Sequence, residues 1–172
     1  MSGHPASPTS ASSALADVPR LGARGGGWVV LQFLLIAAVV VLGLLAPGWP
    51  GGARWWLKGA GALVLIGGAL VLALAGRALG SGFTPFPKPA EGGALVEEGP
   101  YGVVRHPVYS GGLLVATGIS LALSPWALVP TAVLAVVWAL KASVEERFLI
   151  ARYPGYAGYC ERTRYRLLPF VY

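Results

Sequence analysis

Residues 108–143 read VYSGGLLVATGISLALSPWALVPTAVLAVVWALKAS. The two apolar stretches in this segment, 108–123 and 125–143, are each close to the length of a helix that crosses the hydrocarbon core of a bilayer. The pair Ser124-Pro125 joins them, and Pro125 falls in the first turn of the second stretch, where a helix tolerates proline. So short a connection predicts two antiparallel helices, a hairpin that enters the membrane and returns.

Two more apolar stretches precede this hairpin, at 27–46 and 59–79. Proline and glycine break the chain between them, and a second Pro/Gly-rich stretch at 81–93 ends the second. The chain is 55% hydrophobic and 12% charged, whereas a soluble domain carries about 25% charged residues. The sequence therefore predicts an all-α, multi-pass membrane bundle of about four spans.

The chain divides into three parts by composition. Residues 1–26 are rich in Ser, Ala, Pro and Gly and lack apolar periodicity, which predicts a disordered N-terminal arm. Residues 27–79 hold two membrane helices. Residues 80–172 hold a loop, the hairpin and a C-terminal tail, and we expect the functional core there.

The positive charges predict how the chain lies in the membrane. If the N-terminus is cytoplasmic and the chain crosses four times, only Arg54 and Lys58 of its 13 lysines and arginines lie outside. Cytoplasmic segments are the ones enriched in these residues, so both termini are expected in the cytoplasm. The loop 80–107 and the tail 144–172 then meet on one face, and we expect the tail to cover a site there.

Other features narrow the class of protein. The single cysteine, Cys160, excludes an intramolecular disulfide, and with only two histidines the chain offers little for a metal site. The net charge of +6 lies where it would face anionic lipid, so we expect membrane lipids and no nucleic acid as partners. No protein partner follows from the sequence.

A polar cluster stands at the mouth of the third apolar stretch: Arg105, His106, Pro107 and Tyr109. Pro107 suits a first helical turn, which places His106 at a helix N-terminus, where free N–H groups suit an anion. Arg105 adds a forked guanidinium that pairs with carboxylate or phosphate. Taken singly, Arg105 is an anchor to lipid phosphates, His106 a helix-end residue and Tyr109 an interfacial aromatic. Together they indicate a site.

A second polar cluster, Glu145 and Glu146, is expected to close the fourth helix. Carboxylates there oppose the helix dipole, so helix stability does not explain them. Lys141 is placed to pair with Glu145 at a spacing of four residues, and a solvated pair accounts for Glu145 better than for Glu146. The alternative is a carboxylate pair that binds hydroxyls or a cation.

The tail repeats tyrosine at 153, 156 and 159 and then becomes basic. Such a segment lies naturally on an anionic leaflet. It is also positioned to fold over the site as a lid.

Two passages together carry a resemblance: LVEEGPYGVVRHPVYSGG at 95–112 and EERFLIARYPGYAGYCERTRYRLLP at 145–169. In this order and separation they resemble the isoprenylcysteine carboxyl methyltransferase family, which is related to the phospholipid N-methyltransferases. The resemblance covers roughly residues 93–170. It implies methyl transfer from S-adenosyl-L-methionine, held in a non-Rossmann pocket between the hairpin and the tail. From the composition we expect no metal site.

The resemblance also assigns residues. Arg105 and Glu145 are the expected catalytic pair, which organises the cofactor carboxylate or the acceptor. The residues expected to bind the cofactor are Val96, Gly99, His106, Pro107, Tyr109 and Glu146.

The acceptor is expected to be lipophilic, with a carboxylate of isoprenylcysteine type favoured because it needs no strong base. The enzymatic alternative is a phospholipid amine, which must lose a proton first. A membrane reductase using a nicotinamide cofactor is a further enzymatic alternative. A non-catalytic scaffold or lipid-binding protein is the alternative from another class.

Overall fold

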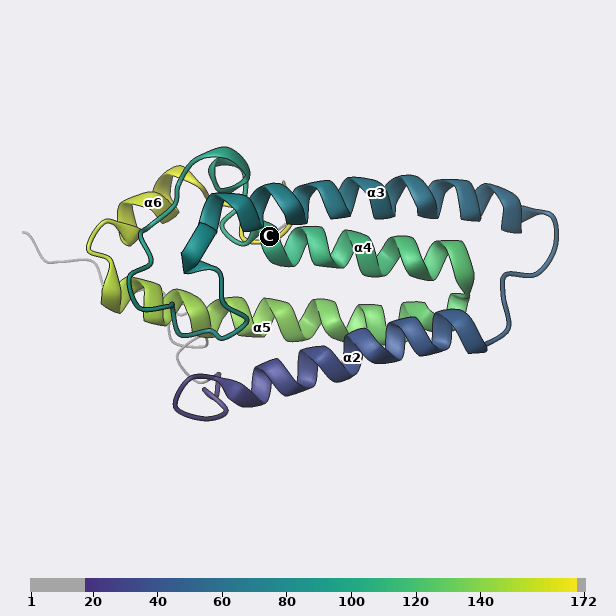
Figure 1. The fold of residues 1–172 in the computed structure, drawn as a ribbon, viewed down its shortest axis with the longest axis horizontal. Coiled ribbons are helices and arrows are strands. Elements are labelled where there is room, and N and C mark those ends of the chain that lie inside the picture. The colour runs from purple at the N-terminus through teal and green to yellow at the C-terminus, as the bar shows by residue number, and fades with distance from the viewer. Residues whose placement is uncertain (1–17, 170–172) are drawn as a thin grey trace, which may run out of the picture.

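The computed structural model describes residues 18–169, and every regular element in that range is helical (Figure 1). The α-helices are α2 (Gly26–Leu45), α3 (Ala53–Leu79), α4 (Pro107–Leu123), α5 (Leu128–Arg152) and α6 (Tyr156–Arg162), and the 3₁₀ turns are η2 (Gly80–Gly82), η3 (Gly99–Gly102) and η4 (Pro125–Ala127).

The helices confirm the predicted membrane bundle. Within the described range, α2, α3 and α5 with their flanking turns are long and apolar enough to cross a bilayer. The fourth apolar helix, α4, has 17 residues, which is at the short end of the spanning range. All four lie side by side with their long axes close to parallel (Figure 1).

The hairpin of α4 and α5 turns where the sequence predicts. The Ser124 hydroxyl accepts a hydrogen bond from the Trp126 backbone N–H at 3.3 Å, which caps η4. Deeper in the bundle, the hydroxyls of Ser120 on α4 and Thr131 on α5 lie 3.0 Å apart. These bonds satisfy the polar groups inside the hairpin, as a membrane interior requires.

Helices α3 and α4 approach through paired glycines. At Gly61 and Gly68 of α3, and at Gly111 and Gly118 of α4, an added Cβ would lie 2.6–2.7 Å from a backbone nitrogen of the facing helix. Only glycine fits at such a distance. Small residues at helical spacing thus bring the two backbones together, which is the usual device for packing helices in lipid.

Two helix bounds differ from the prediction by more than a turn. Helix α3 begins at Ala53 rather than at 59, and α5 continues to Arg152 rather than ending at 143. Hydropathy falls where charged residues appear, but these residues remain helical. Arg54 and Lys58 are exposed in the first turns of α3, whereas Glu146 of α5 forms ion pairs inside the fold. The expectation that Glu145 and Glu146 close the helix was therefore wrong: both lie more than one turn before its end.

The N-terminal arm also differs where the structure describes it. Its residues 1–17 lie outside the described residues. Residues 18–25 pack onto the bundle: Arg147 donates a hydrogen bond to the Val18 carbonyl, and Val18 packs against a cluster that includes Trp28. Buried apolar surface and the hydrogen bond from Arg147 hold Val18 in place.

The irregular segments divide between the two ends of the bundle. At one end lie the connection between α2 and α3 and the turn between α4 and α5 (Figure 1). At the other end the long loop that follows α3, the start of α4, the end of α5 and helix α6 gather together. The predicted meeting of loop and tail is confirmed, and it creates the site described next.

Candidate active site

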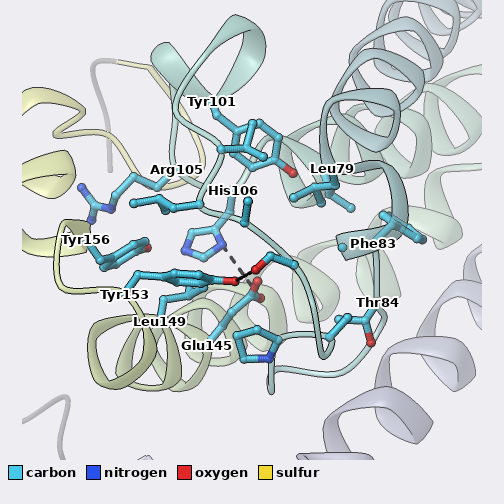
Figure 2. Close-up of a pocket in the computed structure, with 18 of the residues that line it drawn as sticks. Leu79, Phe83, Thr84, Tyr101, Arg105, His106, Glu145, Leu149, Tyr153 and Tyr156 are labelled. Carbon is cyan, nitrogen blue, oxygen red and sulfur yellow. Dashed lines mark hydrogen bonds and ion pairs between the residues drawn. The ribbon is translucent and has the colours of Figure 1, made fainter.

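A cavity of about 780 Å³, including space open to the surface, lies at the loop end of the bundle. Its walls come from the end of α3, the loop that follows, the start of α4, the end of α5 and the tail (Figure 2). The residues that line it are Leu79, Gly82, Phe83, Thr84, Pro89, Ala90, Gly93, Ala94, Leu95, Val96, Tyr101, Arg105, His106, Val108, Tyr109, Glu145, Leu149, Tyr153, Tyr156 and Tyr159.

The tail is held against the start of α4 by backbone hydrogen bonds. The N–H groups of Arg105 and His106 donate to the carbonyls of Tyr165 and Arg166, each at 2.9 Å. The Arg105 guanidinium also donates to the Thr163 carbonyl at 2.8 Å. The tail therefore forms a fixed wall of the cavity.

The buried Glu146 ties the loop, α5 and the tail together. Its Oε1 accepts from Arg105 Nε at 2.8 Å and lies 3.3 Å from His106 Nε2, while Oε2 accepts from Arg166 Nη2 at 2.5 Å. Glu146 does not line the cavity. Its carboxylate is occupied by the protein's own cations, which makes it a structural anchor behind the site.

Glu145, the next residue along the helix, faces the cavity instead. Its Oε2 accepts a hydrogen bond from the Tyr109 hydroxyl at 2.5 Å and lies 4.0 Å from His106 Nδ1. The prediction that Glu145 pairs with Lys141 was wrong, because Lys141 Nζ instead donates to Gln32 and to a backbone carbonyl. Within residues 18–169 no lysine or arginine forms an ion pair with Glu145, so this carboxylate remains available to a ligand.

Three stacked rings form the floor beside this carboxylate. His106 stacks on Tyr109, and Tyr109 stacks on Trp138, with ring centroids 5.5 Å apart in both pairs. His106 stands between the two carboxylates, with Nδ1 toward Glu145 and Nε2 toward Glu146. The stack and the two carboxylates fix the orientation of the imidazole.

Tyrosines of η3 and the tail supply another part of the cavity wall. The Tyr159 hydroxyl donates to the Tyr101 carbonyl at 2.7 Å, and the Tyr153 hydroxyl donates to the Gly93 carbonyl at 2.6 Å. Burial raises the pKa of Tyr101, Tyr156 and Tyr159 above the ordinary tyrosine value. These side chains therefore stay neutral at physiological pH and offer aromatic surface with hydroxyl groups.

Five of the eight residues predicted for the site line the cavity, namely Val96, Arg105, His106, Tyr109 and Glu145. The other three, Gly99, Pro107 and Glu146, do not. Gly99 opens η3 with a φ of 61°, a conformation that favours glycine, and Pro107 begins α4. Both shape the chain next to the cavity.

The residues that the prediction missed lie mostly in the loop after α3. Phe83, Thr84 and Leu95 stand in irregular chain with no motif or periodicity to mark them. The tail tyrosines did carry a signal, their three-residue spacing, and the predicted lid position agrees with the cavity wall that they form.

A second, mainly apolar cavity of about 1080 Å³, open space included, adjoins the first. The two share Phe83, Thr84, Val108 and Tyr109 as lining residues. Residues of α2, α4 and α5 supply most of its walls, and one of them, Phe33, is 55% exposed on the outside of the bundle. The first cavity, called the polar cavity below because Arg105, His106 and Glu145 line it, thus shares a wall with an apolar space among the helices.

Comparison with known proteins agrees with this architecture. The phospholipid methyltransferase family matches residues 56–155, which run from α3 through α5 and make up more than half of the chain. The chain is also 40% identical over 73 residues to the cobalt-zinc-cadmium resistance protein CzcN of Cupriavidus metallidurans, a match that covers 40% of this chain and 33% of that relative. The chain therefore spans only about a third of the length of that relative. The predicted resemblance is confirmed: the chain belongs to the phospholipid methyltransferase family, which comprises membrane methyltransferases of the isoprenylcysteine carboxyl methyltransferase kind.

Proposed function

We propose that this protein transfers a methyl group from S-adenosyl-L-methionine to the carboxylate of a lipophilic acceptor at the membrane surface. One observation carries the proposal: a polar cavity with an available carboxylate shares a wall with an apolar cavity inside the bundle. A soluble, charged cofactor suits the first cavity. A lipid acceptor suits the second.

The lining of the first cavity fits this cofactor. S-adenosyl-L-methionine carries a sulfonium and an ammonium. The Glu145 carboxylate lines the cavity and forms no ion pair with a lysine or arginine of residues 18–169. The aromatic rings of Tyr101, Tyr153 and Tyr156 offer surface for a flat base. Arg105 lines the same cavity and has the donors for a carboxylate.

Methyl transfer requires little of the protein except that it hold the methyl donor and the acceptor in position. When bound, the sulfonium supplies an activated methyl group; its S–C bond breaks, an O–C bond forms to the acceptor, and the electron pair stays on sulfur. A carboxylate acceptor has no proton to lose. The task of the His106–Tyr109–Trp138 stack and of Glu145 is then to hold the reacting groups in line, which is the part of catalysis that fixed side chains supply well.

The second cavity provides the acceptor route. Its lining is predominantly apolar, so a hydrocarbon chain gains free energy by entering it from water or an interface. The shared residue Tyr109 lies where the polar end of such an acceptor meets the first cavity. This arrangement lets acceptor and cofactor arrive by different paths.

A second candidate is N-methylation of a phospholipid amine, which the description of the matched family favours. This reaction needs a base for the amine proton, and among the cavity residues His106 and Glu145 are the groups able to accept one.

Transfer of radiolabelled methyl to two lipophilic acceptors tests the proposal. We expect purified protein with labelled S-adenosyl-L-methionine to methylate N-acetyl-S-farnesyl-cysteine, giving a base-labile methyl ester. Methylation of phosphatidylethanolamine instead would favour the amine candidate. Labelling of neither by folded protein that binds S-adenosylhomocysteine would contradict both acceptor assignments.

A further inference from the structure

Lys141 of α5 is a buried cation that forms no ion pair within the described part of the chain. Its side chain is 1% exposed and lines the second cavity. The ammonium donates to Gln32 Oε1 at 2.5 Å and to the Pro85 carbonyl at 2.7 Å, and it lies 5.2 Å from the centre of the Tyr109 ring. Within residues 18–169, no carboxylate forms an ion pair with it.

The orientation of Gln32 follows from its partners. Its side-chain oxygen accepts from Trp138 Nε1 at 3.1 Å as well as from Lys141 Nζ. Both partners are obligate donors, so the atom between them is the oxygen and the amide –NH₂ is the other end. No residue in the described range accepts a hydrogen bond from that –NH₂. Gln32 lines the same cavity, which therefore contains an ammonium and an amide donor on mainly apolar walls.

An unpaired buried cation among membrane helices is costly, and such groups are kept where they serve a ligand or a pathway. We propose that Lys141 and the Gln32 amide bind the carboxylate of the methyl acceptor and so select anionic acceptors; this rests on the function proposed above. The acceptor's carboxylate then becomes the ion-pair partner of Lys141.

The position of Lys141 suits this role. It lies four residues before Glu145 on α5, about 6 Å along the helix axis, and its ammonium lies over Tyr109, which belongs to both cavities. A carboxylate held there stands beside the wall where the two cavities meet. The hydrocarbon part of the acceptor then occupies the apolar remainder of the second cavity.

The charge also distinguishes substrate from other lipids. Methylation converts the carboxylate into a neutral ester, which loses its attraction to the ammonium, so product is bound more weakly than substrate. A protonated amine head group at the same place meets a like charge, which disfavours it. Lys141 thus separates the two candidate acceptor classes by electrostatics.

Calorimetric binding of a matched ligand pair tests the assignment. N-acetyl-S-farnesyl-cysteine and its carboxamide differ in charge and share the lipid chain, and each is titrated into wild type, Lys141→Met and Gln32→Glu with saturating S-adenosylhomocysteine. We expect wild type to favour the carboxylate by about tenfold or more, as charge-assisted hydrogen bonds do. Both variants lose that preference and keep their affinity for S-adenosylhomocysteine.

Gln32→Glu gives the sharper control because it is nearly isosteric and supplies Lys141 with an internal counter-ion. Variants that retain the carboxylate preference would overturn the proposal, as would wild type that binds neither farnesyl ligand. Weaker S-adenosylhomocysteine binding in both variants would mean that Lys141 binds the cofactor. Binding of phosphatidylethanolamine that depends on Lys141 would mean that Lys141 binds a phosphate. Either result would overturn the assignment. Failure of wild type to bind S-adenosylhomocysteine would instead count against the proposed function itself.

Discussion

Two adjacent carboxylates in one helix have different surroundings. Successive residues of an α-helix point about 100° apart, so Glu146 turns toward Arg105 and Arg166, whereas Glu145 turns toward Tyr109 and the cavity. Glu146 forms ion pairs with cations of the protein itself. Glu145 is left for a ligand.

This difference predicts separate effects on stability. Glu146→Gln removes a buried charge that Arg105 and Arg166 share, and breaking a buried ion pair costs about 3–5 kcal/mol. We expect a clear fall in the melting temperature of the detergent-purified variant, measured by circular dichroism. The control Glu145→Gln loses a single charged acceptor for Tyr109, so its melting temperature should change much less. Equal melting temperatures for the two variants would show that Glu146 is not the anchor.

At the scale of elements, the site depends on how closely α3 and α4 pack. Gly68 and Gly111 lie against facing backbone, and this contact brings the loop after α3 over the start of α4. The neighbouring Gly67 has no atom within 4 Å of an added Cβ. The helix therefore presents one glycine to a partner and the next to open space.

Valine substitutions at these neighbours test the packing. Gly68→Val places a Cβ 2.7 Å from the backbone nitrogen of Val115, and overpacking of this kind costs about 1–3 kcal/mol. We expect a lower melting temperature and weaker S-adenosylhomocysteine binding for Gly68→Val than for the matched control Gly67→Val. Similar losses in both variants would mean that the close approach of the two helices does not support the site.

The helices also show which parts of the structure can be predicted from the sequence. Apolar stretches identified each membrane helix, because a span must be apolar wherever lipid surrounds it. They misplaced the start of α3 and the end of α5, because charged residues lower hydropathy without ending a helix. Arg54 and Lys58 are exposed and still helical, and Glu146 forms its ion pairs inside the fold. The unusual polar motif predicted Arg105, His106 and Glu145 at the cavity, whereas Phe83 and Thr84 come from irregular chain that carries no pattern.

At the scale of the whole molecule, the bundle separates two environments. Loop, tail and helix ends enclose the polar cavity at one end, and the helices enclose the apolar cavity next to it. The positive charges predict that this end faces the cytoplasm, where a soluble cofactor is available. The proposed function therefore requires a soluble, charged cofactor in the polar cavity.

The most direct test is calorimetric titration of S-adenosylhomocysteine into detergent-purified wild type and Glu145→Gln. Because Glu145 is the available carboxylate of the cavity, we expect saturable one-to-one binding to wild type. Loss of a charged hydrogen-bond partner should weaken binding to the variant by about tenfold or more, with its melting temperature close to that of wild type. Absence of binding to folded wild type, or equal affinity in the two proteins, would contradict the account.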